Sequence, residues 1–352
     1  MYGRIQTRPL PPDDETCAPR CRVAPTRSSI LLHFTIRFLL ISFFINLPHM
    51  KNNSLKVGIV GVGRFGSRHL SKWLEMDDIE FVGFNDINKN VCKKLKKEQG
   101  LSYYPLDELI DKVDILDIVV PISVHYIIAE KALEAGKHIF VEKSFTETLD
   151  QAKKLADIAD KKNVRVGIGH IERYNPVLIE LKKQLSHPPK KLLTFRQGPF
   201  IPGYGVDVSI IKELMIHDID LITHFIPYPI ESIQAAGEIL HSDKIDRATA
   251  IINFSNGFEA ILFASRAEKD RRREVLCTDG DIDYKADLMN RKLSSTKNSE
   301  VQSFEFSDAM KDELTAFIEA VRNNQNYLVN ASVGCNTVEI ADKIEEKIKV
   351  KD

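Results

Sequence analysis

Short apolar runs that alternate with helical patterns constrain the fold of this chain more than any other feature. Between Leu55 and His170, five such runs occur in order: LKVGIV, IEFVGFND, VDILDIVVP, HIFVEK and VRVGIGH. The intervening stretches, such as HYIIAEKALEAGK, have apolar residues at helical spacing, and Gly136 stands where a helix C-cap would fall. Strand and helix in repeated alternation predict a parallel sheet with helices on both faces. The fold class is therefore predicted as α/β, with a doubly wound sheet.

The pattern changes after about residue 190. Segments such as RATAIINFSNGFEAILFAS and REVLCTDGDIDYKAD alternate apolar and polar residues, and the turn pairs Asn256-Gly257 and Asp279-Gly280 lie inside them. They predict a second domain of α+β type with a mostly antiparallel open sheet. Two final helical patterns, AMKDELTAFIEAVRNN and VGCNTVEIADKIEEKIK, each have one apolar face and are expected to pack back across the structure. The predicted domains are 50–171 and 172–352.

The first 49 residues differ in character from the rest. An apolar run at residues 30–47 is just long enough to cross a bilayer, but His33 and Arg37 would be costly at membrane depth. A signal anchor is one interpretation. We favour another, in which residues 1–49 come from a misassigned upstream start and Met50 opens the functional chain.

Charge and cysteine usage exclude several classes of function. A formal net charge of -1 gives no electrostatic reason to expect nucleic acid as a partner. The cysteines are odd in number and have neither the spacing of a metal site nor that of a disulfide framework. They are Cys17, Cys21, Cys92, Cys277 and Cys335. No metal site is predicted, no membrane is expected for the two domains, and a reducing, cytoplasmic location is favoured.

Three glycines follow the first apolar run. Gly61, Gly63 and Gly66 fit G-x-G-x-x-G between a strand and a helix, and Asp86 ends the next strand 20 residues after Gly66. An ordinary glycine-rich turn is the alternative, but strand, helix and acid in these places predict a Rossmann domain whose helix N-terminus binds a pyrophosphate. Asp86 would accept hydrogen bonds from the adenosine ribose and favours NAD over NADP. Arg64, inside the loop, is placed to reach the adenine side or a phosphate.

The stretch VGIVGVGRFGSRHL, followed by VVPISVHYIIAEKALEAGKHIFVEKSF, resembles the N-terminal half of the Gfo/Idh/MocA oxidoreductases, whose usual pattern includes TPxxxH and then EKP. The resemblance runs from about Lys56 to the C-terminus. Glu142 and Lys143 match the EK pair, while Ser144 replaces a proline that the family associates with a cis peptide. The resemblance implies further residues at the cofactor site beside the glycines. They are Phe65, Pro121, His125, Glu142 and Lys143.

Farther along, KELMIHDIDLITHF resembles the family's D-x-x-x-H element. His217 matches the histidine, and Glu213 occupies the place of the aspartate. The resemblance implies that Glu213 and His217 share a helix face and meet Lys143 in a cleft between the domains; an amphipathic helix with its charges in water is the alternative. We expect His217, oriented by Glu213, to act as general base, with Lys143 stabilising the alkoxide, although these two roles could be exchanged.

The segment GHIERYNPVL resembles the branch of the family that acts on nucleotide-linked amino sugars. This implies NAD-dependent oxidation of C3 of UDP-N-acetylglucosamine to a ketone, for synthesis of 2,3-diamino sugars of the lipid A type. A different sugar or an inositol is one alternative substrate, and a non-catalytic NAD-binding sensor is another possible function. A homodimer or homotetramer is expected by resemblance. Five residues are candidate substrate contacts, each of which could instead be structural: His170, Arg173, Tyr174, Asn175 and Asp218.

Overall fold

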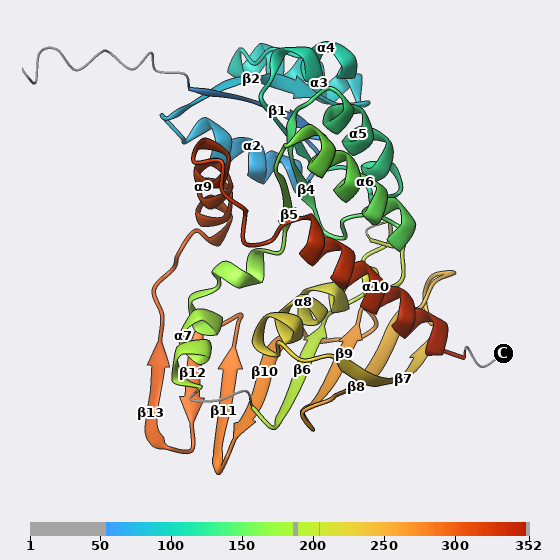
Figure 1. The fold of residues 1–352 in the computed structure, drawn as a ribbon, viewed down its shortest axis with the longest axis vertical. Helices are drawn as coiled ribbons and strands as arrows, with labels where there is room; N and C mark the ends of the chain where they lie inside the picture. The colour runs from blue at the N-terminus through green and yellow to red at the C-terminus, as the bar shows by residue number, and fades with distance from the viewer. Residues whose placement is uncertain (1–53, 186–188, 204, 350–352) are drawn as a thin grey trace, which may run out of the picture. The chain divides into compact units, whose positions relative to one another are not determined.

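The computed structural model describes residues 54–185, 189–203 and 205–349 of the chain. They belong to one unit of the structure, drawn in colour in Figure 1. The apolar run at residues 30–47 and the start predicted at Met50 lie outside these residues. In the part of the chain that is described, no helix has the length and apolarity that crossing a bilayer requires.

The five apolar runs of the N-terminal half form a parallel sheet, as predicted. Its strands lie in the order β2-β1-β3-β4-β5. Val57 of β1 pairs with Phe81 of β2 on one side and with Ile115 of β3 on the other. The strands are β1 (Leu55–Val60), β2 (Ile79–Asn85), β3 (Ile115–Ile118), β4 (His138–Glu142) and β5 (Val166–Gly169).

Helices connect these strands on both faces of the sheet. They are α2 (Gly66–Leu74), α3 (Lys89–Gln99), α4 (Leu106–Lys112), α5 (Ile122–Glu134) and α6 (Leu149–Lys162). The strand order reverses direction at β1, and right-handed crossovers then place α2 on the face opposite to α5 and α6 (Figure 1). The doubly wound prediction is therefore confirmed. Gly136 follows α5 with φ +72°, and its N–H donates to the Leu133 carbonyl, which confirms the expected helix end.

The C-terminal half contains an eight-stranded sheet in the order β13-β12-β11-β10-β6-β9-β8-β7. β6 and β9 are parallel and the other neighbours are antiparallel, so the predicted mostly antiparallel sheet is confirmed. The turns at Asn256-Gly257 and Asp279-Gly280 join β8 to β9 and β10 to β11, as expected. The strands are β6 (Lys191–Gln197), β7 (Ile230–Glu238), β8 (Arg247–Phe254), β9 (Glu259–Ser265), β10 (Arg272–Asp279), β11 (Ile282–Asp287), β12 (Lys292–Ser295) and β13 (Asn298–Ser303).

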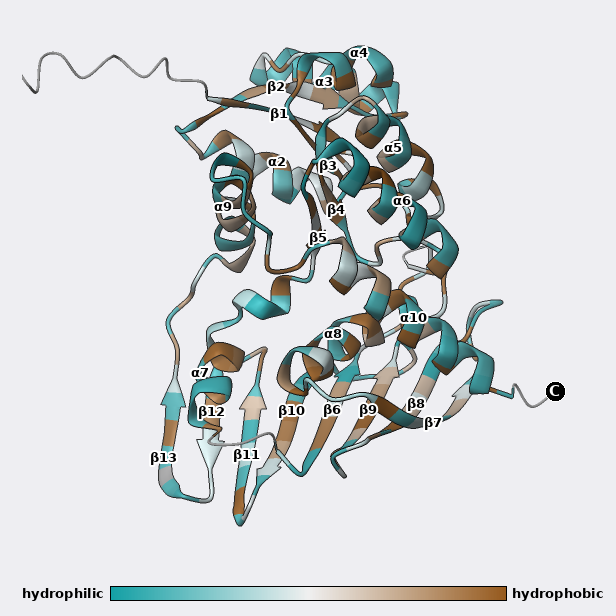
Figure 2. Ribbon diagram, in the orientation of Figure 1, coloured by the Kyte–Doolittle hydropathy of each residue, from teal (hydrophilic) through white to brown (hydrophobic). Residues whose placement is uncertain are grey.

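The remaining helical segments cover one face of this second sheet or return to the first. They are a 3₁₀ helix η1 (Ile171–Tyr174), α7 (Pro176–Gln184), a π-helical turn η2 (Ile211–Met215), α8 (Ile216–Phe225), α9 (Ala309–Arg322) and α10 (Ala331–Lys347). Buried apolar residues of α8 and of the second half of α10 belong to the core of the second sheet, and Figure 2 colours these elements by hydropathy. The alternating burial of β6, β8 and β9 fits a sheet with only one buried face.

The C-terminal helices tie the two halves together. Phe317 of α9 packs edge-on against Phe140 of β4 at 5.4 Å between ring centroids and lies in the core of the first sheet. In α10, Val338 joins this first core, whereas Ile344 joins the core of the second sheet. The helix α10 thereby contacts both β5 and α8. The division into domains 50–171 and 172–352 stays a prediction.

Candidate active site

The glycine loop between β1 and α2 leaves an open cradle. A side chain at Gly66 would collide with the Gly61 carbonyl, and one at Gly61, where φ is +88°, would collide with the Val119 carbonyl. These two glycines close the turn. A Cβ at Gly63 would have no atom within 4 Å, and the loop leads into the N-terminus of α2, where helix amides favour an anion. The shape and the donor groups therefore fit a pyrophosphate.

Asp86 borders this cradle. Its carboxylate oxygens accept hydrogen bonds from the backbone N–H groups of Val62, at 2.8 Å, and Asn88, at 2.7 Å. Each oxygen keeps a further lone pair, so the carboxylate can also accept from a ribose hydroxyl. Arg64 is exposed on the loop, and Phe65 packs against the ring of His69 at 5.3 Å. These positions agree with a dinucleotide that extends along the carboxyl edge of the sheet.

A buried ionic group, not anticipated from the sequence, lies under this edge. The His69 Nδ1 atom is 2.9 Å from Asp117 Oδ2, which also accepts from the Trp73 indole N–H at 2.7 Å. The His69 Nε2 atom is 3.2 Å from Glu142 Oε1. Burial opposes a charge on His69, but Asp117 and Glu142 outweigh it and raise its pKa to about 10. An imidazolium therefore holds the Glu142 carboxylate at the end of β4.

Two sequence signals could have found this group. Asp117 is the one acid in the apolar run ILDIVV, and a buried carboxylate requires a partner. His69 and Trp73 are four residues apart and therefore share a face of α2.

The segment after Glu142 is fixed by contacts from both halves of the molecule. The Lys143–Ser144 peptide bond is cis. The Ser144 hydroxyl donates to the Lys212 carbonyl at 3.0 Å, and the Ser144 carbonyl lies 2.9 Å from His125 Nδ1. The other His125 nitrogen lies 2.8 Å from the Val120 carbonyl, and burial lowers the pKa of this histidine. His125 thus connects the segments that follow β3 and β4, and its contact with a cofactor stays a prediction. The same holds for Pro121, which occupies the N-cap position of α5.

Lys143 and Glu213 form a further direct link between the two halves. The Lys143 ammonium donates to the Glu213 carbonyl at 2.8 Å and to its carboxylate at 3.0 Å. The expected orientation of His217 by Glu213 is thus replaced by a pair between Glu213 and Lys143. The reason is local: Glu213 belongs to the π-helical turn η2, in which residues four apart no longer stack as they do in an α-helix.

Two imidazoles lie next to each other beside this pair. The rings of His170 and His217 are 6.3 Å apart and nearly perpendicular. Both ring nitrogens of His170 and the Nδ1 atom of His217 are buried without a hydrogen-bond partner, although the His217 side chain as a whole is partly exposed. Burial, followed by the charges of Arg196 and Lys143, holds the pKa of His217 well below its ordinary value. Buried polar atoms usually have a hydrogen-bond partner, and a substrate hydroxyl is one group that would supply it.

The other predicted substrate residues already have partners inside the protein. Arg173 forms a bidentate pair with Asp220, with distances of 2.8 and 2.6 Å. The Tyr174 hydroxyl donates to that of Tyr327 at 3.1 Å. These contacts fix the position of η1. The geometry does not require Arg173 or Tyr174 to contact a substrate, so those two roles stay predictions.

Asn175 and Asp218 also have hydrogen-bond partners inside the protein. The Asn175 side chain accepts from the Val177 N–H and so caps α7. Asp218 is buried, and its Oδ1 atom accepts two hydrogen bonds from Arg196, at 3.1 and 3.0 Å, while its Oδ2 atom has no hydrogen-bond partner among the described residues. Among the five substrate candidates, His170 and Asp218 therefore have buried polar atoms without such a partner, and the ring of His170 lies beside that of His217.

Comparison with known proteins places these features in a family. Residues 55–170 match the family model described as "Oxidoreductase family, NAD-binding Rossmann fold", and residues 206–283 match the GFO/IDH/MocA C-terminal domain. A UDP-N-acetylglucosamine 3-dehydrogenase of Acidithiobacillus ferrooxidans is 32% identical over 240 residues, which are 68% of this chain and 76% of that protein. The scyllo-inositol 2-dehydrogenase (NAD(+)) of Bacillus subtilis is 27% identical over 308 residues, which are 79% and 89% of the two chains.

Solved structures agree. The crystallised UDP-N-acetylglucosamine 3-dehydrogenase of A. ferrooxidans superposes with a TM-score of 0.79 at 28% identity, covering 84% of this chain and 98% of that one. A scyllo-inositol dehydrogenase of Lactobacillus casei with bound NAD(H) and scyllo-inositol has a TM-score of 0.73 at 20% identity, with coverage of 84% and 97%. The second likeness concerns the fold.

Proposed function

This chain belongs to the Gfo/Idh/MocA oxidoreductase family and is an NAD-dependent dehydrogenase, and from that premise we propose that it oxidises the C3 hydroxyl of UDP-N-acetylglucosamine to a ketone. The 3-keto sugar would then be converted by an aminotransferase to a 2,3-diamino sugar of the lipid A type. The observation that carries the proposal is a pair of neighbouring imidazoles with unpartnered nitrogens, both of which the Lys143 charge influences. The relative at 32% identity supplies the choice of substrate.

The residues of the chain divide the chemistry as follows. Bound NAD supplies the acceptor for a hydride. Because its pKa is lowered, His217 is neutral near pH 7 and can take the proton from the substrate hydroxyl. Lys143, held by Glu213, can stabilise the negative charge that develops on the same oxygen. The exchange of these two roles remains the alternative mechanism.

A direct assay tests this function. Purified protein with NAD is given UDP-N-acetylglucosamine, free sugars or inositols, with and without an aminotransferase that removes a keto product, and reduced nicotinamide absorbance is followed. We expect a signal with the nucleotide sugar that increases when the product is removed. Turnover of an inositol alone would replace the substrate proposed here by the second candidate, which the scyllo-inositol relative favours. Binding of NAD without turnover of any substrate would favour a sensor.

A further inference from the structure

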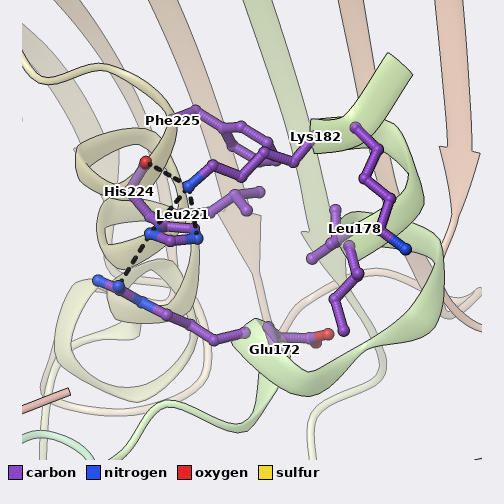
Figure 3. Close-up of a pocket in the computed structure, with 9 residues that line it drawn as sticks. Glu172, Leu178, Lys182, Leu221, His224 and Phe225 are labelled. Carbon is purple, nitrogen blue, oxygen red and sulfur yellow. Dashed lines mark hydrogen bonds between the residues drawn. The ribbon is translucent and has the colours of Figure 1, made fainter. Parts of the chain in front are cut away.

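A pocket lies between η1, α7 and α8 (Figure 3). Its volume is about 270 Å³. One wall is apolar and comprises Leu178, Leu221 and Phe225. The polar lining residues are Glu172, Arg173, Lys182, Lys183 and His224. None of the roles assigned above to the sequence motifs involves Lys182 or His224.

The polar lining residues have more hydrogen-bond donors than acceptors. Arg173 Nη1 lies 2.9 Å from His224 Nδ1, and the Lys182 ammonium lies 2.9 Å from His224 Nε2 (Figure 3). Burial, with Arg173 and Lys182 next in effect, lowers the pKa of His224 to about 4, so the ring is neutral at pH 7. A neutral imidazole has one acceptor nitrogen and one N–H. One of the two cations therefore faces an N–H group of the ring, although Lys182 also donates to the His224 backbone carbonyl at 3.3 Å.

The carboxylates nearby do not relieve this excess of positive charge. Arg173 is neutralised by Asp220. Glu172 lines the pocket, but its carboxylate binds Arg196 at 2.9 Å. Lys182 forms no ion pair with any carboxylate of the described residues, whereas its neighbour Lys183 lies 3.9 Å from Glu180. Among the described residues, negative charge is thus lacking beside Lys182 and His224.

An oxyanion bound beside Lys182 and His224 would supply the missing negative charge, and its oxygens accept several hydrogen bonds. His224 lies on the same helix as His217. His217 and His224 are seven residues apart in α8, which is two turns or about 10 Å along one face. A ligand that reacts beside His217 and carries its anionic group farther along the molecule would reach both places.

We propose that Lys182, His224 and Arg173 form a phosphate-binding subsite that holds the diphosphate of a nucleotide-linked sugar, with the nucleoside against Leu178, Leu221 and Phe225. The inference rests on the proposed function, because it assigns a place to the part of that substrate which does not react. It predicts that the binding energy for the substrate comes largely from a group remote from the oxidised carbon.

Two lysine substitutions provide the test. Lys182→Met removes the cation that has no carboxylate partner among the described residues, and Lys161→Met removes an exposed cation on α6, outside the pocket, as the control. Binding of UDP to the NAD-loaded enzyme is measured by calorimetry for the native chain and both variants. We expect Lys182→Met to weaken UDP binding about tenfold or more, because a charge-assisted contact is lost. Lys161→Met should stay within about twofold, since exposed charges far from the ligand contribute little. With UDP-N-acetylglucosamine, Lys182→Met should raise KM while kcat and the KM for NAD change little.

Inorganic pyrophosphate and uridine distinguish the parts of the ligand. Pyrophosphate binding that depends on Lys182 supports a phosphate subsite. UDP binding that is equal in all three proteins, or absent from the native chain, overturns the inference, as does binding that depends on uridine alone. If UDP binds through Lys182 but UDP-N-acetylglucosamine is not oxidised, the subsite stands and the proposed substrate fails. If both variants oxidise UDP-N-acetylglucosamine with the KM of the native chain, the proposed substrate stands and the phosphate subsite fails.

Discussion

His217 combines a buried ring nitrogen with positive neighbours, and this combination keeps its ring neutral. A neutral imidazole is the form that accepts a proton. We expect His217→Asn to lower kcat by about a hundredfold or more, because a positioned base contributes at least that much. Affinity for NAD, followed by fluorescence, should not change. Near-normal turnover in this variant would exclude His217 as the base.

The same histidine predicts a pH dependence. Because the pKa of His217 lies below its ordinary value of 6.5, the base form persists into mildly acidic solution. The acid limb of kcat/KM should therefore fall below pH 6.5, measured in the direction of NAD reduction at several pH values. An acid limb above pH 6.5 would contradict this assignment.

Gly63 and Gly66 differ in what surrounds them, and this separates cofactor binding from folding. Gly63→Ala places a methyl group in open space, so thermal stability should change little while the Kd for NAD rises. Gly66→Ala forces a collision with the Gly61 carbonyl and should lower the Tm. Thermal unfolding without cofactor and NAD titration measure both. An unchanged NAD affinity in a folded Gly63→Ala variant would contradict the cradle described above.

Among the strands, β6, β8 and β9 present a second face whose residues are only partly buried. It carries apolar side chains, and the rings of Phe195 and Phe263 lie 6.2 Å apart on it. Such a face is typical of association between copies. The expected homodimer or homotetramer stays a prediction, and Phe263→Lys should shift it to monomer in light scattering. Leu240→Glu, an exposed position outside these strands, serves as control; a native monomer would contradict the prediction.

Local pattern accounts for much of this architecture. Alternation of apolar residues located β8 and β9, and the pairs Asn256-Gly257 and Asp279-Gly280 located their turns, because a hairpin depends on residues close in sequence. Local pattern does not predict the partner of Glu213. It depends on a π-helical turn, and Lys143 lies 70 residues away in the chain. The pair of Lys182 with His224 likewise forms only when α7 packs beside α8.

At the scale of the whole molecule, buried histidines contribute to the pH dependence of the free energy of unfolding. His69 has a pKa of about 10 in the folded protein and 6.5 as its ordinary value, so the folded state binds more protons between these values. The stabilisation is complete below pH 6.5 and is lost as the pH rises toward 10. His170 has a lowered pKa, since burial keeps it neutral, so its contribution decreases as the pH falls below 6.5. Stability should therefore be greatest near neutrality.

His69→Gln tests the alkaline half of this expectation. The variant lacks the imidazolium between Asp117 and Glu142, so its Tm should be lower than that of the native chain at neutral pH. Its decline in Tm between pH 6.5 and 10 should also be shallower. Equal slopes in the two proteins would show that His69 does not hold the proton as described.

Transfer of a labelled hydrogen tests the proposed reaction without reference to any one residue. The protein is incubated with NAD and UDP-N-acetylglucosamine deuterated at C3, and the reduced cofactor is analysed by mass spectrometry. We predict reduced nicotinamide that carries the deuterium, because the hydride leaves from C3. Unlabelled reduced cofactor, or no reduced cofactor at all with this substrate, would contradict the proposed reaction.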